Sequence, residues 1–213
     1  MKSSTITGSD VTRILALTLG LSTLGITSTA SAATELVVNG GFEAPVIATG
    51  TYSFLSTIPG WTLDPSSLGT SFEVRNNFNT PYEGNQFIEL NSDNTTSISQ
   101  NLATTAGDVY ELSFAFSPRP GYAQNIMRIY WDGALVDTLS ASGVGNTDNA
   151  WKVYTYNLTA TSSSTHLAFD DLLETNVLPG GSHLDAVSVQ GVPEPSTLAL
   201  LGLGMIGILK RRR

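Results

Sequence analysis

Along most of the chain, apolar and polar side chains alternate one by one, which is the pattern of a half-buried β-strand. Apolar side chains occupy every second position over residues 109–116, and the same alternation runs over 126–131. Asp132-Gly133 follows directly, and this dipeptide between two apolar runs predicts a β-hairpin. Further short runs rich in β-branched or aromatic residues lie at 86–90, 151–156 and 166–169.

Turn-forming residues separate these runs, with Gly, Asn, Asp and Pro gathered at 39–41, 91–94 and 179–181. Outside the two ends of the chain, apolar residues do not follow the i, i+3, i+4, i+7 spacing of an amphipathic helix. Many short strands without helices predict an all-β fold, a single jelly-roll or β-sandwich domain over residues 33–191. The absence of cysteine excludes disulfides, thiolate metal sites and thiol nucleophiles.

The first 32 residues have the order of a secretory signal peptide. Lys2 and Arg13 lie in a polar start, and an apolar run follows from 14 to 26. That run is shorter than the roughly 20 residues that a membrane-spanning anchor needs. Ala30 and Ala32 have the A-x-A spacing that signal peptidase recognises, which predicts cleavage after Ala32.

Residues 192–213 form a tail that begins with Pro193, Glu194 and Pro195 and continues as an uncharged apolar run over 198–209. As a helix this run would span about 18 Å, which is short of the ~30 Å hydrocarbon core of a membrane. The tail predicts transient membrane insertion before its removal, and a permanent tail anchor is the alternative. A block of cations ends the chain: Lys210, Arg211, Arg212 and Arg213.

This order of motif, apolar run and terminal arginines resembles the PEP-CTERM sorting signal of Gram-negative bacteria. The resemblance implies that a membrane-embedded exosortase recognises Pro193-Glu194-Pro195 and removes the tail. It also implies export, through signal peptidase and a transient inner-membrane tail, to the cell surface or the extracellular matrix.

Without its two ends, the chain is strongly acidic. Residues 33–192 contain 16 acidic and four basic side chains, a net charge of about −12, against −8 for the whole chain. Such a field repels phosphate backbones, so nucleic acid is excluded as a partner. The negative charge favours solubility in water, and it is compatible with the binding of divalent cations or of a neutral polysaccharide.

Short motifs follow one another in order along the part between the two ends. They resemble the galactose-binding-like β-sandwich of choice-of-anchor surface proteins and of certain plant cell-wall proteins, over about residues 34–191. The family usually has a second acid where this chain has Ala186. The resemblance implies glycan binding and a structural Ca²⁺ where the first and last strands meet. The motifs lie at 39–43, 58–62, 83–91, 98–102, 106–114 and 184–187.

Two carboxylates are candidates for that calcium site, and no other cofactor is predicted. Asp185 is in phase with Val187 and Val189, so the alternation directs it toward the side that these valines bury. A carboxylate there must be paired, hydrogen-bonded or metal-bound. Glu43 is the matching acid near the N-terminus, and with backbone carbonyls the two could bind Ca²⁺. The alternative is that both acids only accept backbone N–H bonds at strand ends.

Sugar binding requires an exposed aromatic ring with planar hydrogen-bonding side chains beside it. Turn-like segments contain Phe78, Tyr82 and Tyr122, and Arg75 and Arg119 supply polar partners. Packing of the loops themselves is the alternative role for these rings. The tryptophans lie in or beside apolar strands and are expected in the core: Trp61, Trp131 and Trp151.

The sequence contains no arrangement that meets the geometric needs of an enzyme. Ser182, His183 and Asp185 have the residue types of a hydrolytic triad, but adjacent strand residues point to opposite faces, so Ser182 and His183 cannot pair. A glycosidase needs only two carboxylates. Asp170-Asp171 and Glu174 supply such groups, but we interpret them as a solvated strand end.

The sequence therefore predicts a non-catalytic, exported surface or matrix protein whose sandwich binds extracellular polysaccharide. A purely structural adhesion or coat component without a glycan site is the main alternative, and a polysaccharide hydrolase is the third.

Overall fold

The computed structural model describes residues 34–91, 94–172 and 181–193. The predicted signal peptide with Ala30 and Ala32 lies outside these residues, as do Glu174 and the tail from Glu194 and Pro195 to the terminal arginines. Within the described ranges, no helix has the length and apolar character needed to cross a bilayer. The described residues are built from strands, turns and loops.

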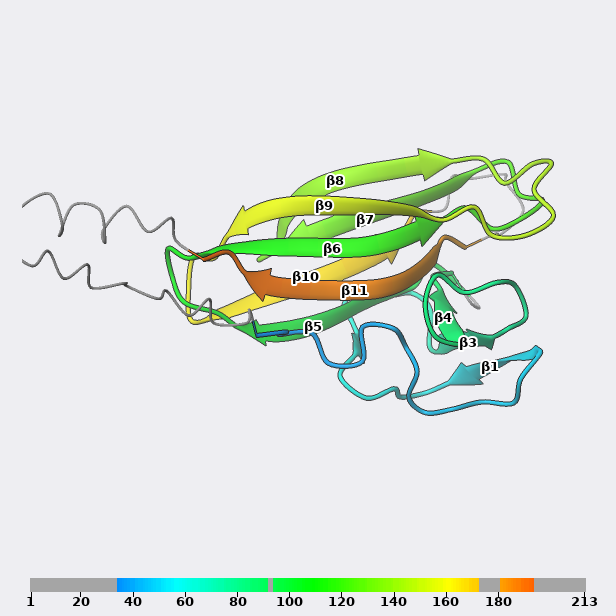
Figure 1. Ribbon diagram of the computed structural model, residues 1–213, viewed down its shortest axis with the longest axis horizontal. Helices are drawn as coiled ribbons and strands as arrows, with labels where there is room; N and C mark the ends of the chain where they lie inside the picture. The colour runs from blue at the N-terminus through cyan, green and yellow to red at the C-terminus, as the bar shows by residue number, and fades with distance from the viewer. Residues whose placement is uncertain (1–33, 92–93, 173–180, 194–213) are drawn as a thin grey trace, which may run out of the picture. The chain divides into compact units, whose positions relative to one another are not determined.

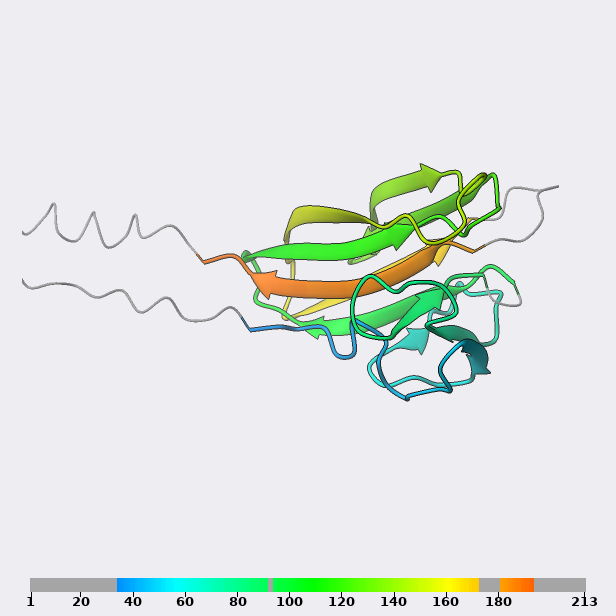
Figure 2. The ribbon, with the colours of Figure 1, turned by 45° about the vertical axis from the view of Figure 1, so that its right-hand side comes forward.

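The strands of the described residues form two antiparallel sheets that pack face to face (Figures 1 and 2). One sheet has six strands in the order β1-β3-β4-β11-β6-β9, and the other has five in the order β2-β5-β10-β7-β8. The predicted all-β sandwich is therefore confirmed. The strands are β1 (Thr51–Leu55), β2 (Thr62–Leu63), β3 (Phe72–Asn76), β4 (Gln86–Glu89), β5 (Ser97–Ala103), β6 (Val109–Ser117), β7 (Asn125–Trp131), β8 (Ala134–Ala141), β9 (Lys152–Thr159), β10 (Ser164–Asp171) and β11 (His183–Gly191).

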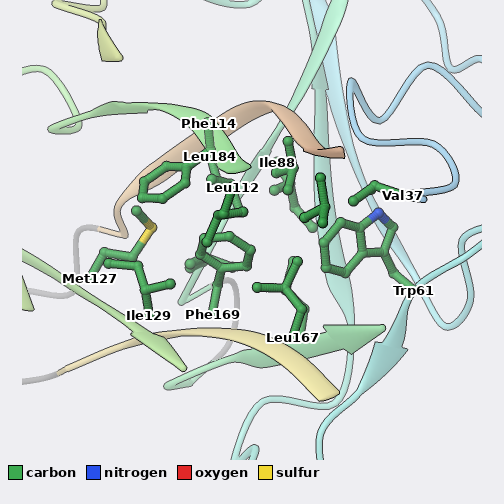
Figure 3. Close-up of a cluster of buried hydrophobic side chains, with 14 of the residues drawn as sticks. Val37, Trp61, Ile88, Leu112, Phe114, Met127, Ile129, Leu167, Phe169 and Leu184 are labelled. Carbon is green, nitrogen blue, oxygen red and sulfur yellow. The ribbon is translucent and has the colours of Figure 1, made fainter. Parts of the chain in front are cut away.

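The inner faces of the two sheets enclose one apolar core (Figure 3). Phe114 of β6 and Phe169 of β10 meet across it, with ring centroids 5.1 Å apart. Each ring is almost completely buried, and burial of a large apolar side chain contributes about 1.5–3 kcal/mol to folding. The labelled core residues include Val37, Trp61, Ile88, Leu112, Met127, Ile129, Leu167 and Leu184.

The burial of side chains confirms the alternation predicted over residues 109–116 and 126–131. In β6 the apolar residues Leu112 and Phe114 belong to the core cluster, and in β7 Met127 and Ile129 do the same. The predicted hairpin joins β7 to β8. Asp132 and Gly133 have φ of 52° and 79° there, the left-handed conformation that a two-residue hairpin turn requires.

Two expectations about burial need correction. Trp61 and Trp131 lie in the core as predicted, but Trp151 is only partly buried and lies on the outer side of the six-stranded sheet, against Phe87. Asp170 and Asp171 do not form a solvated strand end, since their exposed fractions are 7% and 2%. A carboxylate can be buried here because Arg128 pairs with Asp170.

A β-bulge in β11 overturns the predicted direction of Asp185. The register shifts between Asp185 and Ser188, and Ala186 has a φ of 51°. The extra residue changes the phase of the strand, so Leu184 and Val187 both face the core. Asp185 therefore points to the outer side of the sheet, although its exposed fraction is 0%.

The start and the end of the described domain lie side by side. Glu35 forms a bridge with Gln190, and the N–H of Leu36 donates to the carbonyl of Val189 at 3.0 Å. The Glu35 carboxylate also accepts the N–H of Val189 at 2.9 Å. Residues 34–38 are thus fixed along β11, next to the point where the chain leaves the domain (Figure 1).

Candidate functional site

The outer side of the six-stranded sheet carries a cluster of buried charges. Strands β3, β4 and β11 lie side by side, and Glu73 and His183 both stand opposite Glu89 in the register. Side chains that stand opposite one another in a sheet are close enough to interact. This placement makes Glu89, with an exposed fraction of 0%, the centre of the cluster.

Two arginines neutralise Glu89. Arg75 pairs with Glu89 and also with Glu73, where its Nη2 lies 2.6 Å from Oε1. Arg119, from the loop after β6, places Nη1 2.5 Å from the other oxygen of Glu89. His183 places Nε2 3.4 Å from Glu89. Glu73, Arg75, Glu89, Arg119 and His183 are called the charge cluster below.

The surroundings of Glu73 and Glu89 shift the pKa values of these two residues in opposite directions. Burial, with the neighbouring charge of Glu89, raises the pKa of Glu73 to about 7. Burial also acts to raise the pKa of Glu89, but its hydrogen bond and charge interaction with His183 and the charges of the arginines lower it overall. Burial lowers the pKa of His183, which has no exposed surface.

Aromatic rings cover Arg75 from the solvent side. Tyr52 stands opposite Arg75 in the register of β1 and β3, so the two side chains share a face. The guanidinium carbon lies 5.5 Å from the ring centroid of Tyr52 and 5.2 Å from that of Phe78. Both are cation–π distances. These contacts hold the two rings against Arg75 instead of leaving them free in solution.

Tyr52 and Phe78 form an exposed aromatic group with Phe54, in which the rings meet edge to face. The ring centroid of Tyr52 lies 5.8 Å from that of Phe54 and 5.5 Å from that of Phe78. Tyr52, Phe54 and Phe78 are exposed to 47%, 54% and 49%. Tyr82, on the same loop as Phe78, is 48% exposed and packs its edge against Trp151. Tyr52, Phe54, Phe78 and Tyr82 are called the aromatic face below.

Hydrogen bonds to neighbouring segments fix the loop that carries Phe78 and Tyr82. The Asp148 carboxylate accepts the N–H of Thr80 at 2.9 Å, and Trp151 Nε1 donates to the Thr80 carbonyl at 2.9 Å. At the other end of the loop, Asp185 Oδ2 accepts the N–H of Tyr82 at 2.9 Å. The exposed rings therefore stand on an ordered support, as recognition of a rigid ligand requires.

The predicted glycan contacts gather on this side of the molecule, although they come from strand β3 and from different loops. Arg75 and Phe78 touch each other, and Arg119 lies over the ring of Tyr122 at 4.5 Å. The two arginines, however, are occupied by the carboxylates of the charge cluster. Tyr52 and Phe54 were not among the predicted contacts. Their signal in the sequence is the alternation Tyr52-Ser53-Phe54 in a short strand.

The two candidate calcium ligands support the same loop. Glu43 Oε1 accepts the N–H groups of Asn85 and Gln86 at 2.7 and 2.8 Å, and Asp185 accepts those of Tyr82, Glu83 and Ala186. Both acids thus make the backbone bonds of the alternative interpretation. Among residues 34–91, 94–172 and 181–193, no three His, Cys, Asp or Glu side chains gather in a position to hold a metal. Calcium binding stays a prediction.

Ser182 and His183 do not form a nucleophile–base pair. The hydroxyl of Ser182 donates to Asp171 at 3.1 Å, whereas Nδ1 of His183 lies 2.8 Å from the amide oxygen of Asn149. The two side chains thus have different partners, as opposite directions along a strand require.

Buried carboxyl groups predict an unusual dependence of stability on pH. Burial is the main cause that raises the pKa of Glu73, Asp171 and Asp185 to about 7 in the folded domain, against about 4 in an unfolded chain. Between these values the folded state binds more protons. The free energy of unfolding should therefore fall as pH rises from 4 to 7, by up to about 1.4 kcal/mol per pH unit for each group.

We expect a higher melting temperature at pH 5 than at pH 8. Asp171→Asn removes one of the titrating groups and should flatten the profile. Asp108→Asn, at an exposed position, should leave the profile unchanged. A melting temperature that rises steadily from pH 5 to pH 8 would contradict the prediction.

The geometry and the C-terminal motif together define a class. Residues 191–213 match the model of the PEP-CTERM protein-sorting motif, which confirms that part of the resemblance. The motif marks a secreted, cell-surface-targeted protein, and the folded part is a β-sandwich with an aromatic face on one sheet. The chain belongs to the family described as "Protein of unknown function (DUF642)", whose model matches residues 35–190. No curated protein matches the sequence.

Solved structures similar to this chain include carbohydrate-binding modules. The family 16 carbohydrate-binding module-2 is 12% identical, with a TM-score of 0.47 over 72% of this chain and 98% of the module. The CBM22-1 xylan-binding domain from Paenibacillus barcinonensis is 15% identical, with a TM-score of 0.44 over 70% and 100%. TmCBM61, in complex with β-1,4-galactotriose, is 13% identical, with a TM-score of 0.45 over 73% and 97%.

Proposed function

We propose that this protein is a non-catalytic component of the bacterial cell surface or extracellular matrix, and that its aromatic face binds extracellular polysaccharide. In this proposal residues 1–32 are removed by signal peptidase, residues 33–191 form the binding domain, and an exosortase removes the segment 192–213. The cell is a Gram-negative bacterium, and the tail enters its inner membrane only transiently.

The observation that carries the proposal is the set of neighbouring, half-exposed rings above Arg75. The ring centroid of Tyr52 lies within 6 Å of the centroids of both Phe54 and Phe78. Exposing apolar rings to water is unfavourable, so an aromatic group of this kind usually marks an interaction site. The C–H groups of a sugar can pack against the face of a single exposed aromatic ring. A neutral chain avoids repulsion by an acidic domain.

Of the predicted contacts, Phe78 and Tyr82 would touch the sugar directly. Arg75 and Arg119 would act from below by holding Phe78 and Tyr122 in place, since both guanidinium groups lie over these rings. This division of roles follows from the ion pairs that both arginines make with Glu89.

Alanine at Tyr52 or Phe78 should weaken binding to the producer's own exopolysaccharide about fivefold, since one stacking contact contributes on the order of 1 kcal/mol. Retention on immobilised polysaccharide, with a glycan array in parallel, measures the loss. Val144→Ala is the control, because Val144 is a 63% exposed apolar residue on the loop after β8. Equal retention of all the variants would rule out the aromatic face as the binding surface.

A structural coat component is the second candidate, and one observation favours it. Tyr52 and Phe54 lie on β1, the edge strand of the six-stranded sheet, and an edge strand with exposed apolar residues can pair with another copy. Sedimentation of the native protein and of Phe54→Lys separates the two roles. Self-association that is lost in Phe54→Lys, without retention on any glycan, would favour the coat component.

A further inference from the structure

The outer side of the opposite, five-stranded sheet contains a groove. Strand β10 places His166, Ala168 and Asp170 on this side at alternate positions, and β7 places Arg128 and Tyr130 beside them. Ala168 stands opposite Tyr130, and Asp170 stands opposite Arg128. Because Ala168 carries only a methyl group, space remains between its larger neighbours. The resulting cavity has a volume of about 310 Å³.

Fixed polar groups form one wall of the groove. Arg128 binds both oxygens of Asp170, with Nε to Oδ1 at 2.8 Å and Nη2 to Oδ2 at 2.6 Å. The guanidinium carbon lies 5.7 Å from the ring centroid of Tyr130. These three side chains are therefore held in one arrangement before any ligand arrives, which lowers the entropy cost of binding.

A second acid lies on the other wall. Asp64 Oδ2 is 3.2 Å from Nε2 of His166, and Asp64 Oδ1 accepts the N–H and the hydroxyl of Ser66 at 2.9 and 2.7 Å. Burial acts to raise the pKa of Asp64, but the hydrogen bonds from Ser66 and the charge of His166 lower it overall. Asp64 is thus a hydrogen-bond acceptor at neutral pH.

The residues that line the groove determine which kind of ligand it can bind. Each carboxylate oxygen has lone pairs beyond those its protein partners use, so the ligand must donate hydrogen bonds, as hydroxyl groups do. Two carboxylates repel an acidic ligand. Tyr130 and Ala168 supply an apolar surface for the C–H face of a sugar ring. The volume lies at the lower end of the range for small-molecule sites, which suits a short stretch of chain.

We propose that this groove binds a short stretch of a neutral sugar chain, independently of the aromatic face on the opposite sheet. The site goes beyond the proposed function, since no residue is shared between the two surfaces. Both oxygens of Asp170 are occupied by Arg128, so this acid is poorly placed to protonate a leaving group. The groove is therefore proposed as a site that binds sugar.

Calorimetry with the purified protein tests the groove, using neutral hexose and pentose trisaccharides and a trisaccharide of uronic acid as probes. We expect at least one neutral trisaccharide to bind and the uronic acid trisaccharide to bind at least tenfold more weakly. Ala168→Leu fills the floor of the groove without changing a polar group, and should weaken binding at least tenfold. Ala103→Leu is the matched control, since Ala103 is an exposed alanine on the neighbouring strand β5.

Tyr130→Ala, which removes the apolar wall, gives a second test if Ala168→Leu does not fold. Binding that survives both substitutions in folded protein would overturn the proposal, as would the absence of binding to every neutral trisaccharide. A loss of trisaccharide binding in Tyr52→Ala would show that the aromatic face, and not the groove, binds these probes. Exopolysaccharide retention that depends on Tyr52 while no trisaccharide binds would leave the proposed function standing without the groove.

Discussion

Replacing Glu89 by glutamine should lower the free energy of unfolding by about 3–5 kcal/mol, the usual cost of removing one partner from a buried ion pair. Glu89 has an exposed fraction of 0% and neutralises both Arg75 and Arg119. The neutral amide would leave Arg75 with Glu73 alone, and the burial that acts to raise the pKa of Glu73 would remain. For a domain of this size, the melting temperature should fall by roughly 6–20 °C.

Thermal unfolding followed by circular dichroism measures the change. Glu111→Gln is the control, because it removes the same charge from an exposed position on β6 of the same sheet. Equal melting temperatures for the two variants would contradict the prediction and would mean that the charge cluster is solvated.

Alanine in place of both Pro193 and Pro195 should reduce delivery of the protein to the cell surface by at least tenfold. The matched sorting motif covers 191–213, and two prolines at this spacing disfavour a helix and favour the extended backbone that a protease active site binds. Alanine at both positions would remove this barrier to helix formation and should make the segment a poorer substrate.

Fractionation of producing cells, with intact-mass measurement of each fraction, tests the sorting prediction. The native protein should appear outside the cell without residues 198–213, and the variant should remain in the membrane fraction at its uncut mass. Gln190→Ala is the control, since Gln190 is exposed and precedes the matched motif. Native protein that reaches the surface with its tail intact would support a permanent anchor instead.

Local patterns predicted the parts of this fold in which neighbouring residues decide the structure. The alternation of β6 and the Asp132-Gly133 turn are such parts, because periodicity and a two-residue turn are properties of a few consecutive positions. The side chain of Asp185 was placed on the wrong side of its strand. A bulge adds one residue to the strand, and nothing in the residues around Ala186 marks it.

The binding surfaces depend on contacts between distant segments, which a single sequence does not contain. The sequence predicted that Arg75 and Arg119 lie near aromatic rings, and the structure has them there. It did not predict their shared partner Glu89, because Glu89 lies in an ordinary run of alternating apolar and polar residues. The groove needs His166 and Asp170 beside Arg128 of another strand. Each strand alone shows only a polar outer face, so the sequence gives no sign of the cavity.

The chain enters and leaves the folded domain at one pole, where Glu35 and Gln190 form their bridge. Figure 1 shows the loops that follow β6 and β8 at the opposite pole. A tether at either end of the domain would therefore hold it in the same orientation, with these loops farthest from the attachment point. A longer or shorter tether would change how far the domain reaches from its support, while the same pole would still face outward.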